Sequence, residues 1–456
     1  MTTSATLDPT SADEGRAATP TLLQRAVARW QSPTFRQAFL SVADQAVVSG
    51  TSFASSVLVG RSCSQDQLGV YALVLSMLLL ARGIQGDLIS GPYLVYCHHR
   101  NREALARYTG SSLIHQTILS LGVLFALMGL AAGMAFAGSS TGLASAVLSL
   151  ALVTPLVLLR EHLRQLSFAH LRLREALAID ILVAMMQLGA VGLLAWTGAL
   201  TVTAIYVSMG AGCGVACLGW LIARPDAVSF RLADAWSDWW SNWQFGRWSL
   251  ASQLISRAMT YLAPWLIAWT HGEAATGLLA ANVTIVNLAG MFVTGVSNAL
   301  TPHAARAYVG GGVTRLRTVL FETLTIFLVT VGGFCGFVAL TGDGLITFVY
   351  GDRFAGAPFV LLLLALQLLA NSIGIVVGNG LWAMNRPEAN FRADVMTLLV
   401  SSGILALAIP TAGITGAAFG LLLGTAAGTL IRIAVLLQIW RNAPLQRDIA
   451  AWEATP

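Results

Sequence analysis

The chain has 456 residues, of which 56% are hydrophobic and only 10% are charged, whereas a soluble globular domain carries about 25% charged residues. This composition excludes an ordinary soluble domain and indicates an integral membrane protein. The formal net charge of +5 comes from arginine alone, because the sequence contains no lysine; it therefore informs orientation in a membrane and not nucleic-acid binding.

Residues 1–37 are rich in Thr, Ala and Ser and lack an apolar core, so they predict a disordered or amphipathic cytoplasmic tail and no signal peptide. Runs of about 20 apolar residues then predict twelve transmembrane helices and no barrel. We expect an all-α fold with two six-helix lobes (38–223 and 248–440), joined by a linker (224–247) and followed by a cytoplasmic tail (441–456). The predicted spans are Phe39–Gly60, Leu68–Leu94, Ser112–Ala137, Leu143–Leu159, Leu177–Ala195, Val202–Ile222, Ser249–Trp269, Thr276–Ala299, Val319–Leu340, Pro358–Trp382, Val395–Ile409 and Ile414–Leu437.

The arginines are distributed unevenly between the loops on the two sides of the membrane. If the N-terminus is cytoplasmic, the loops on the opposite side hold only Arg61 and Arg353. This asymmetry follows the positive-inside rule and predicts that both termini are cytoplasmic.

The two lobes read as copies of one plan. A shift of 208 residues places Ala43–Phe53 on Ala251–Tyr261, with Gln45 on Gln253, and places Gly69 on Gly277. Because each half has an even number of spans, the copies share their orientation. The sequence therefore predicts two pseudo-symmetric lobes, related by a two-fold axis along the membrane normal, around a central cavity.

The linker between the lobes carries four tryptophans, Trp236, Trp239, Trp240 and Trp243, on one helical face. This pattern predicts an amphipathic helix lying at the cytoplasmic membrane surface.

Polar residues concentrate on the first, second, seventh and eighth predicted spans. Asp44 stands inside the first, where a carboxylate costs about 2.5–3.5 kcal/mol on insertion scales, so it must face protein or water. Arg82 and Asp87 lie in the second, and Arg257 lies in the seventh. Two interpretations stay open: ion pairs Asp44–Arg257 and Arg82–Asp87 that hold or gate the lobes, or a site where the arginines receive an anionic substrate.

The candidate site gathers the polar residues of these spans, with Asp44 and Asp87 also as coupling or gate residues. Its substrate-binding candidates are Arg82, Arg257, Asp44, Gln45, Gln253, Tyr261 and Asn287. The five scattered cysteines suggest neither a disulfide framework nor a metal site. With no phosphate-binding loop and no nucleophile–base pair, we expect no enzyme, no catalytic residues and no cofactor.

Three stretches resemble a known family. DQAVVSGTSFASSVLVGRSCSQDQLGVYAL, VYGDRFAGAPFVLLLLALQ and AGITGAAFGLLLGTAAG are similar to segments of polysaccharide flippases in the multidrug/oligosaccharidyl-lipid/polysaccharide exporter superfamily. The resemblance implies alternating access in the bacterial inner membrane. It also implies that undecaprenyl-pyrophosphate-linked oligosaccharide is flipped to the periplasmic leaflet for exopolysaccharide or lipopolysaccharide biosynthesis, with a polysaccharide polymerase and assembly proteins as partners besides membrane lipids. By position, Arg82 and Arg257 would be cavity cations and Asp44 a cavity acid.

The membrane potential favours this substrate over the superfamily's other cargo. Outward movement of a pyrophosphate releases about 2.3 kcal/mol per charge for each 100 mV, whereas a cationic drug moves against the potential and requires a proton or sodium couple. The alternatives are therefore a cation-coupled multidrug or small-molecule exporter, and a non-transporting scaffold for glycan assembly.

Overall fold

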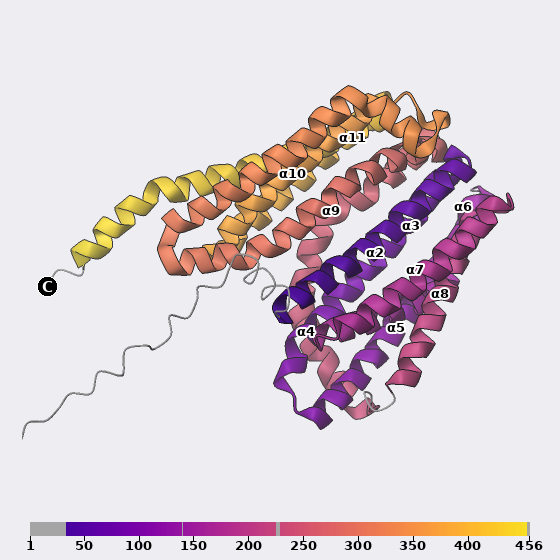
Figure 1. Cartoon of the computed structure of the whole chain (residues 1–456), viewed down its shortest axis with the longest axis horizontal. Helices are drawn as coiled ribbons and strands as arrows, with labels where there is room; N and C mark the ends of the chain where they lie inside the picture. Colours follow the sequence, from indigo (N-terminus) through magenta and orange to yellow (C-terminus); the bar gives the residue numbers. More distant parts are fainter. Residues whose placement is uncertain (1–32, 139, 225–228, 454–456) are drawn as a thin grey trace, which may run out of the picture.

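The computed structural model describes residues 33–138, 140–224 and 229–453, and in these ranges the chain is helical without strands. The prediction of an all-α membrane protein in two lobes is confirmed (Figure 1). Most of the predicted N-terminal tail lies outside the described residues.

Helices α2 to α8 form the first lobe. Their bounds are α2 Pro33–Ser62, α3 Gln65–Gln85, α4 Gly91–Tyr96, α5 Arg102–Phe136, α6 Thr141–Ala169, α7 Leu173–Trp196 and α8 Val202–Ala223. A π-helical turn, Gly86–Ser90, joins α3 to α4. Ser64, Asn101, Ser140 and Thr201 each accept a hydrogen bond from the backbone N–H three residues on, which caps the helix that follows.

The second lobe consists of α9 Leu232–Tyr350, α10 Pro358–Ala383 and α11 Pro387–Glu453. Nine helices of the described chain are long and apolar enough to cross a membrane. Non-helical backbone at Gly272, Gly311 and Gly312 divides α9 into three legs, and Gly413 divides α11 into two. Counted by legs, the described residues supply the twelve crossings that the sequence predicts.

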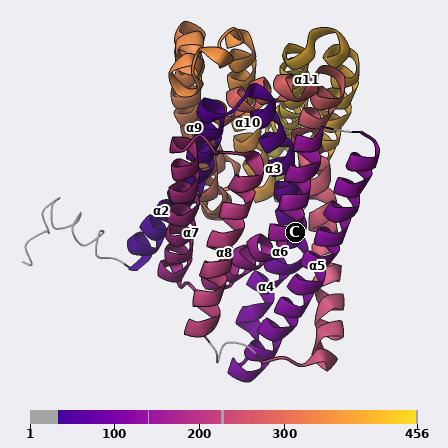
Figure 2. The same cartoon turned by 90° about the vertical axis from the view of Figure 1, so that its right-hand side faces the viewer.

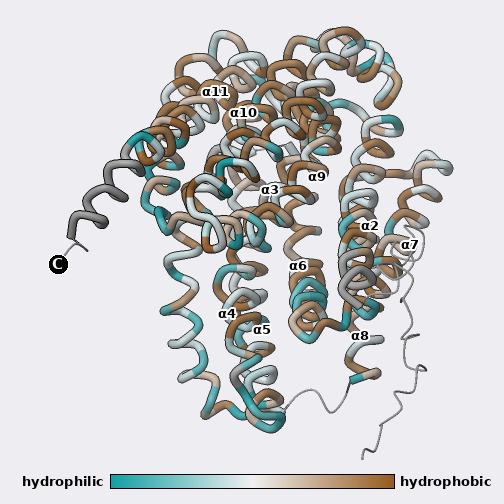
Figure 3. The backbone as a smooth tube through the Cα atoms, turned by 60° about the vertical axis from the view of Figure 1, so that its left-hand side comes forward, coloured by the Kyte–Doolittle hydropathy of each residue, from teal (hydrophilic) through white to brown (hydrophobic). Residues whose placement is uncertain are grey.

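The lobes meet at one end of the molecule and separate toward the other (Figure 1). Seen from the right-hand side of that view, α10 and α11 lie toward the top and the first lobe extends below them (Figure 2). At the end where they meet, Arg61 donates to the backbone carbonyls of Phe348 and Val349, and Ser56 shares a hydrogen bond of 3.0 Å with Tyr350. We call this the closed end. The opposite, open end carries the turns near residues 100, 170 and 385, and hydrophobic residues cover much of the helices between the two ends (Figure 3).

The predicted repeat is visible in the packing at the closed end. A Cβ on Gly69 would lie 1.9 Å from the carbonyl oxygen of Glu273, and a Cβ on Gly277 would lie 2.0 Å from that of Gln65. Each of these contacts is the other one shifted by 208 residues. Such reciprocity is expected when a two-fold axis passes between two equivalent helices.

A second pair of equivalent sites lies at the open end. Leu171 and Asn385 are the non-glycine residues with positive φ in the described chain, at 54° and 57°. They lie 214 positions apart, and their turns share one hydrogen-bond pattern: Arg172 N–H to Ser167 C=O in one lobe and Arg386 N–H to Leu381 C=O in the other. The offset has therefore grown from 208 to 214 along the repeat.

Residues 232–247 of the predicted linker form the beginning of α9. From Leu232 the linker is continuous with the next membrane-crossing leg of α9, and it packs against α5. Asn242 is fully buried and accepts a hydrogen bond of 2.8 Å from Tyr108, while Asp238 forms an ion pair with Arg100 at 2.8 Å. The linker is thus held by specific polar contacts to the first lobe.

The fourth span is longer than predicted. Helix α6 runs from Thr141 to Ala169, ten residues beyond the predicted end at Leu159. Arg160 and Arg164, predicted to lie in a cytoplasmic loop, are instead buried between helices. Their charge is compensated by carboxylates on neighbouring helices, which allows the helix to continue through them.

Candidate substrate cavity and buried ion network

A cavity of about 470 Å³ opens between the lobes toward the open end. Helices α2, α3 and α6 and the π-helical turn line it from the first lobe, and α9 lines it from the other. Six predicted site residues meet here: Gln45, Arg82, Asp87, Gln253, Arg257 and Tyr261. The repeat explains this convergence, because the corresponding first and seventh spans face each other across the axis.

Deeper between the lobes lies a second chamber of about 530 Å³, which shares Leu79 and Tyr261 with the first. Asn287, the remaining predicted substrate-binding residue apart from Asp44, lines this chamber together with hydroxyl groups such as those of Ser52 and Thr284. None of its described lining residues is Asp, Glu, Arg or His. A charged outer cavity and an uncharged inner chamber therefore adjoin each other between the lobes.

Arg257 supplies the free positive charge of the outer cavity. Its side chain is exposed, and it forms no ion pair within the part of the chain that the structure describes. Arg82, also on the cavity wall, is tethered by an ion pair of 2.6 Å to Glu161. A guanidinium without a carboxylate partner is well suited to bind phosphate oxygens.

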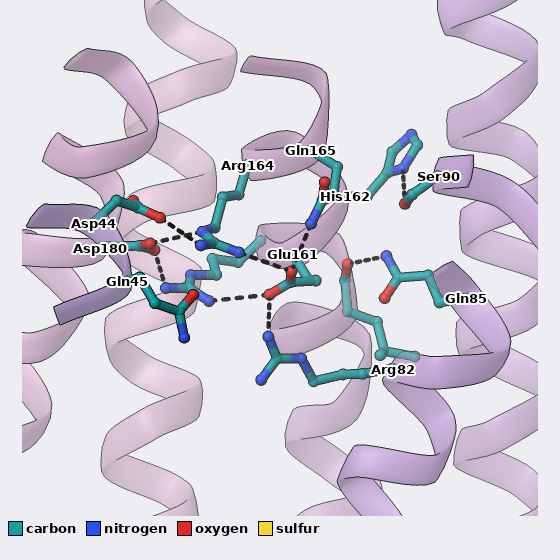
Figure 4. A network of polar contacts seen from close by, with 12 residues as sticks. Asp44, Gln45, Arg82, Gln85, Ser90, Glu161, His162, Arg164, Gln165 and Asp180 are labelled. Carbon is teal, nitrogen blue, oxygen red and sulfur yellow. Dashed lines mark hydrogen bonds and ion pairs between the residues drawn. The ribbon is translucent and has the colours of Figure 1, made fainter. Parts of the chain in front are cut away.

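Beside the cavity, inside the first lobe, lies a network of three carboxylates and three guanidiniums (Figure 4). Glu161 lies within ion-pair distance of Arg82, Arg160 at 3.3 Å and Arg164 at 3.2 Å. Arg164 also bonds Asp180 at 2.7 Å and pairs with Asp44, so helices α2, α3, α6 and α7 are joined. The formal charge of the whole network is zero.

Two predicted pairings are wrong. Asp44 does not face Arg257 across the cavity: it is 1% exposed and pairs with Arg164. Arg82 pairs with Glu161 and not with Asp87, whose Oδ1 accepts a hydrogen bond of 2.7 Å from Ser249. The physical reason is proximity within one lobe, because α6 brings its charges directly behind α2 and α3.

The sequence reasoning missed four members of the network: Arg160, Glu161, Arg164 and Asp180. The hydropathy pattern ends the fourth predicted span at Leu159, so it places the first three of these residues in a loop. Asp180 stands within the predicted fifth span, and an intramembrane carboxylate is by itself a signal of a buried partner.

The second lobe holds a smaller pair at an equivalent place. Asp394, 214 positions after Asp180, bonds Arg432 at 2.5 Å. Gly374 and Gly378 stand 214 positions after Arg160 and Arg164, and a Cβ on Gly374 would lie 3.4 Å from the guanidinium of Arg432. In this lobe α11 therefore supplies the cation that α6 supplies in the other, and the glycines leave room for it.

Comparisons with known proteins bear on the fold. No protein-family model matches the chain. A solved structure described as an inward-facing multidrug resistance MATE family transporter of the MOP superfamily has a TM-score of 0.71, with 15% identity over 88% of this chain and 96% of that one. The chain has the MATE transporter fold.

Two further structures place the chain within this fold. An outward-facing MATE structure gives a TM-score of 0.64 at 15% identity, over 90% of this chain and 96% of that one. A transporter from Pyrococcus furiosus, whose description states that a reverse polarity of its binding pocket suggests a different function, also gives 0.64, at 14% identity over 89% and 95%. The MATE fold thus occurs with binding pockets of differing polarity.

A curated relative shares part of the sequence. The probable low-salt glycan biosynthesis flippase Agl15 of Haloferax volcanii is 25% identical over 142 residues. The match spans 31% of this chain and 30% of that protein.

Proposed function

We propose that the protein is an alternating-access transporter that flips a pyrophosphate-linked oligosaccharide, on its lipid carrier, from the cytoplasmic to the periplasmic leaflet. The observation that carries this proposal is the charge of the outer cavity. Arg257 is free to bind an anion, whereas the carboxylate of Glu161 is shared among three guanidiniums. The lining as a whole carries three guanidiniums and two carboxylates, and this excess of positive charge favours a phosphorylated substrate.

The orientation follows from the arginines at the open end. This end carries Arg-rich turns such as residues 100–107 and 172–174, while the closed end holds Arg61 and Arg353. By the positive-inside rule the open end is cytoplasmic, so the cavity would receive its substrate from the cytoplasmic leaflet. The higher TM-score with the inward-facing MATE structure than with the outward-facing one supports this assignment.

The inner chamber suits an uncharged sugar. A charged group entering it would lose hydration without meeting a charged partner, whereas hydroxyl and amide groups such as Ser52, Thr284 and Asn287 can exchange hydrogen bonds with a glycan. The phosphates would stay at Arg257 while neutral sugars occupy the chamber.

A cation-coupled multidrug or small-molecule exporter is the second candidate. The solved MATE structures cover about nine-tenths of the chain, whereas the flippase relative matches 31% of it, so the comparisons favour this candidate more than the flippase. Its mechanism requires a carboxylate free to bind a proton or sodium. In the outer cavity Glu161 is engaged by arginines. Asp87 accepts a hydrogen bond from Ser249 but forms no ion pair within the described residues, so it is the carboxylate available for such a couple. The excess of guanidiniums over carboxylates in the lining still favours the flippase.

The decisive experiment measures the leaflet distribution of lipid-linked oligosaccharide in cells depleted of the protein and complemented with variants. We expect accumulation in the cytoplasmic leaflet, rescue by the wild type and by Arg392→Ala, and no rescue by Arg257→Ala. Arg392 is a matched control because it is exposed and does not line the outer cavity.

Normal distribution in depleted cells would overturn the flippase proposal. Drug hypersensitivity of the same cells would then support the exporter. Rescue by Arg257→Ala together with wild-type glycan would instead favour the non-transporting scaffold, with the polymerase and assembly proteins as its partners.

A further inference from the structure

A third pocket, of about 310 Å³, lies within the first lobe at the open end and shares no residue with the cavity between the lobes. It is enclosed by α4, by the beginning of α5, by the end of α6 and its following turn, and by the end of α8. We call it the lobe pocket. Its lining residues include three guanidiniums, those of Arg102, Arg172 and Arg224, and none of its described lining residues is Asp or Glu.

Two of these cations are unneutralised. Arg224 donates to Glu175, a carboxylate outside the lining. Arg102 and Arg172 are exposed and form no ion pair within the described ranges. Their excess charge faces a pocket and not bulk solvent alone, which is the arrangement expected of an anion site.

The wall behind the cations is polar and ordered. The Thr109 hydroxyl donates to the Leu105 carbonyl at 2.9 Å, so it accepts from the Tyr93 hydroxyl at 2.8 Å. Tyr93 has then used its only proton, and at 3.1 Å it accepts from Nε2 of His170. This chain of bonds leaves Nδ1 of His170 as the ring atom that can take up a proton when an anion approaches.

The position and the apolar wall identify the source of the anion. Arg102 begins α5, and α6 and α8 end at Ala169 and Ala223, so the pocket lies at the level where membrane-crossing helices meet the headgroup layer. Leu105, Leu166 and Trp220 give one wall an apolar surface. A free phosphate ion would gain nothing from that wall, whereas the glycerol and first acyl carbons of a lipid would.

We propose that the lobe pocket binds the phosphate of an anionic phospholipid, held by Arg102, Arg172 and Arg224. The lipid ties α4, α5, α6 and α8 together at the open end. It thereby stabilises the first lobe as a unit while the two lobes move relative to each other. This site is independent of the transported substrate.

The test uses the purified full-length chain in detergent, with binding measured by native mass spectrometry for phosphatidylglycerol, phosphatidylcholine and inorganic phosphate. We expect phosphatidylglycerol to bind tightly and phosphatidylcholine weakly. Arg102→Gln with Arg172→Gln should weaken phosphatidylglycerol binding by about tenfold for each charge removed.

The matched control is the double variant Arg306→Gln with Arg392→Gln, which removes two exposed arginines from the other lobe. It should bind phosphatidylglycerol as the wild type does, and the lipid-free melting temperature of each variant verifies that it folds. Equal loss in both double variants, or equal binding of the two phospholipids, would overturn the proposal. Binding of inorganic phosphate that depends on Arg102 and Arg172, without preference for phosphatidylglycerol, would assign the site to a free anion and overturn the lipid.

Discussion

Replacing Arg164 with Met should damage the fold much more than replacing Arg257 with Met. Arg164 contacts three carboxylates: Asp44, 1% exposed, Asp180, 2% exposed, and Glu161, 7% exposed. Without it, the two remaining guanidiniums of the network face three buried carboxylates. Removing one partner of a buried ion pair costs about 3–5 kcal/mol, whereas truncating the exposed and unpaired Arg257 should change the free energy of unfolding by no more than about 0.5 kcal/mol.

The assay is denaturant unfolding in detergent micelles, with expression and monodispersity as a first check. Adding Asp44→Asn to Arg164→Met should recover part of the loss, with a coupling of about 0.5–3 kcal/mol in the double-mutant cycle. Conversely, Arg257→Met should fold normally and fail in transport. Equal stability of the two single variants, or no recovery by Asp44→Asn, would refute the assignment of Asp44 to the network.

Three further changes probe other parts of the molecule. Gly69→Val places a side chain where only 1.9 Å is available, so it should force the lobes apart at the closed end and lengthen the distance between spin labels at positions 66 and 352. Burial, with smaller contributions from nearby positive groups, lowers the pKa of His170 below 6.5. The unfolded chain therefore binds this proton at a higher pH than the folded chain does, so stability should fall as the pH drops below about 6.5. Melting temperatures measured against pH should show a smaller fall for His170→Gln. Arg432→Met leaves its carboxylate partner on α11 unpaired and should lower the free energy of unfolding by about 1–3 kcal/mol, while Arg392→Met should not.

The internal repeat shows which part of the symmetry can be predicted from the sequence. The match of Gly69 with Gly277 is visible in the sequence, and the structure gives it a cause: both glycines allow backbones to touch on the two-fold axis. The later drift of the offset to 214, seen in the turns at Leu171 and Asn385, escapes a single fixed shift. Insertions between helices leave the apolar pattern unchanged, so only the equivalent backbone conformations reveal them.

The charged residues inside the helices show what the hydropathy pattern does not predict. Arg432 lies inside a predicted span and is half-buried beside Asp394, and the predicted end of the fourth span at Leu159 places Arg164 in a loop. A hydropathy scale ends a predicted span at its first charged residues, because it assigns to each charge the free energy of an isolated charge in lipid. In the fold these charges meet partners on other helices, and the helix continues.

The sequence by itself determined the membrane class, the twelve crossings, the two-lobe repeat and six of the polar residues that line the cavity. Each of these depends on composition or on spacing along one helix, which the local chain dictates. Only the tertiary structure decided which charges neutralise each other: Asp44 with Arg164, and Arg82 with Glu161, leaving Arg257 free. Ion pairing depends on distances of 3–4 Å between helices far apart in sequence, and those distances exist only after the lobes have packed.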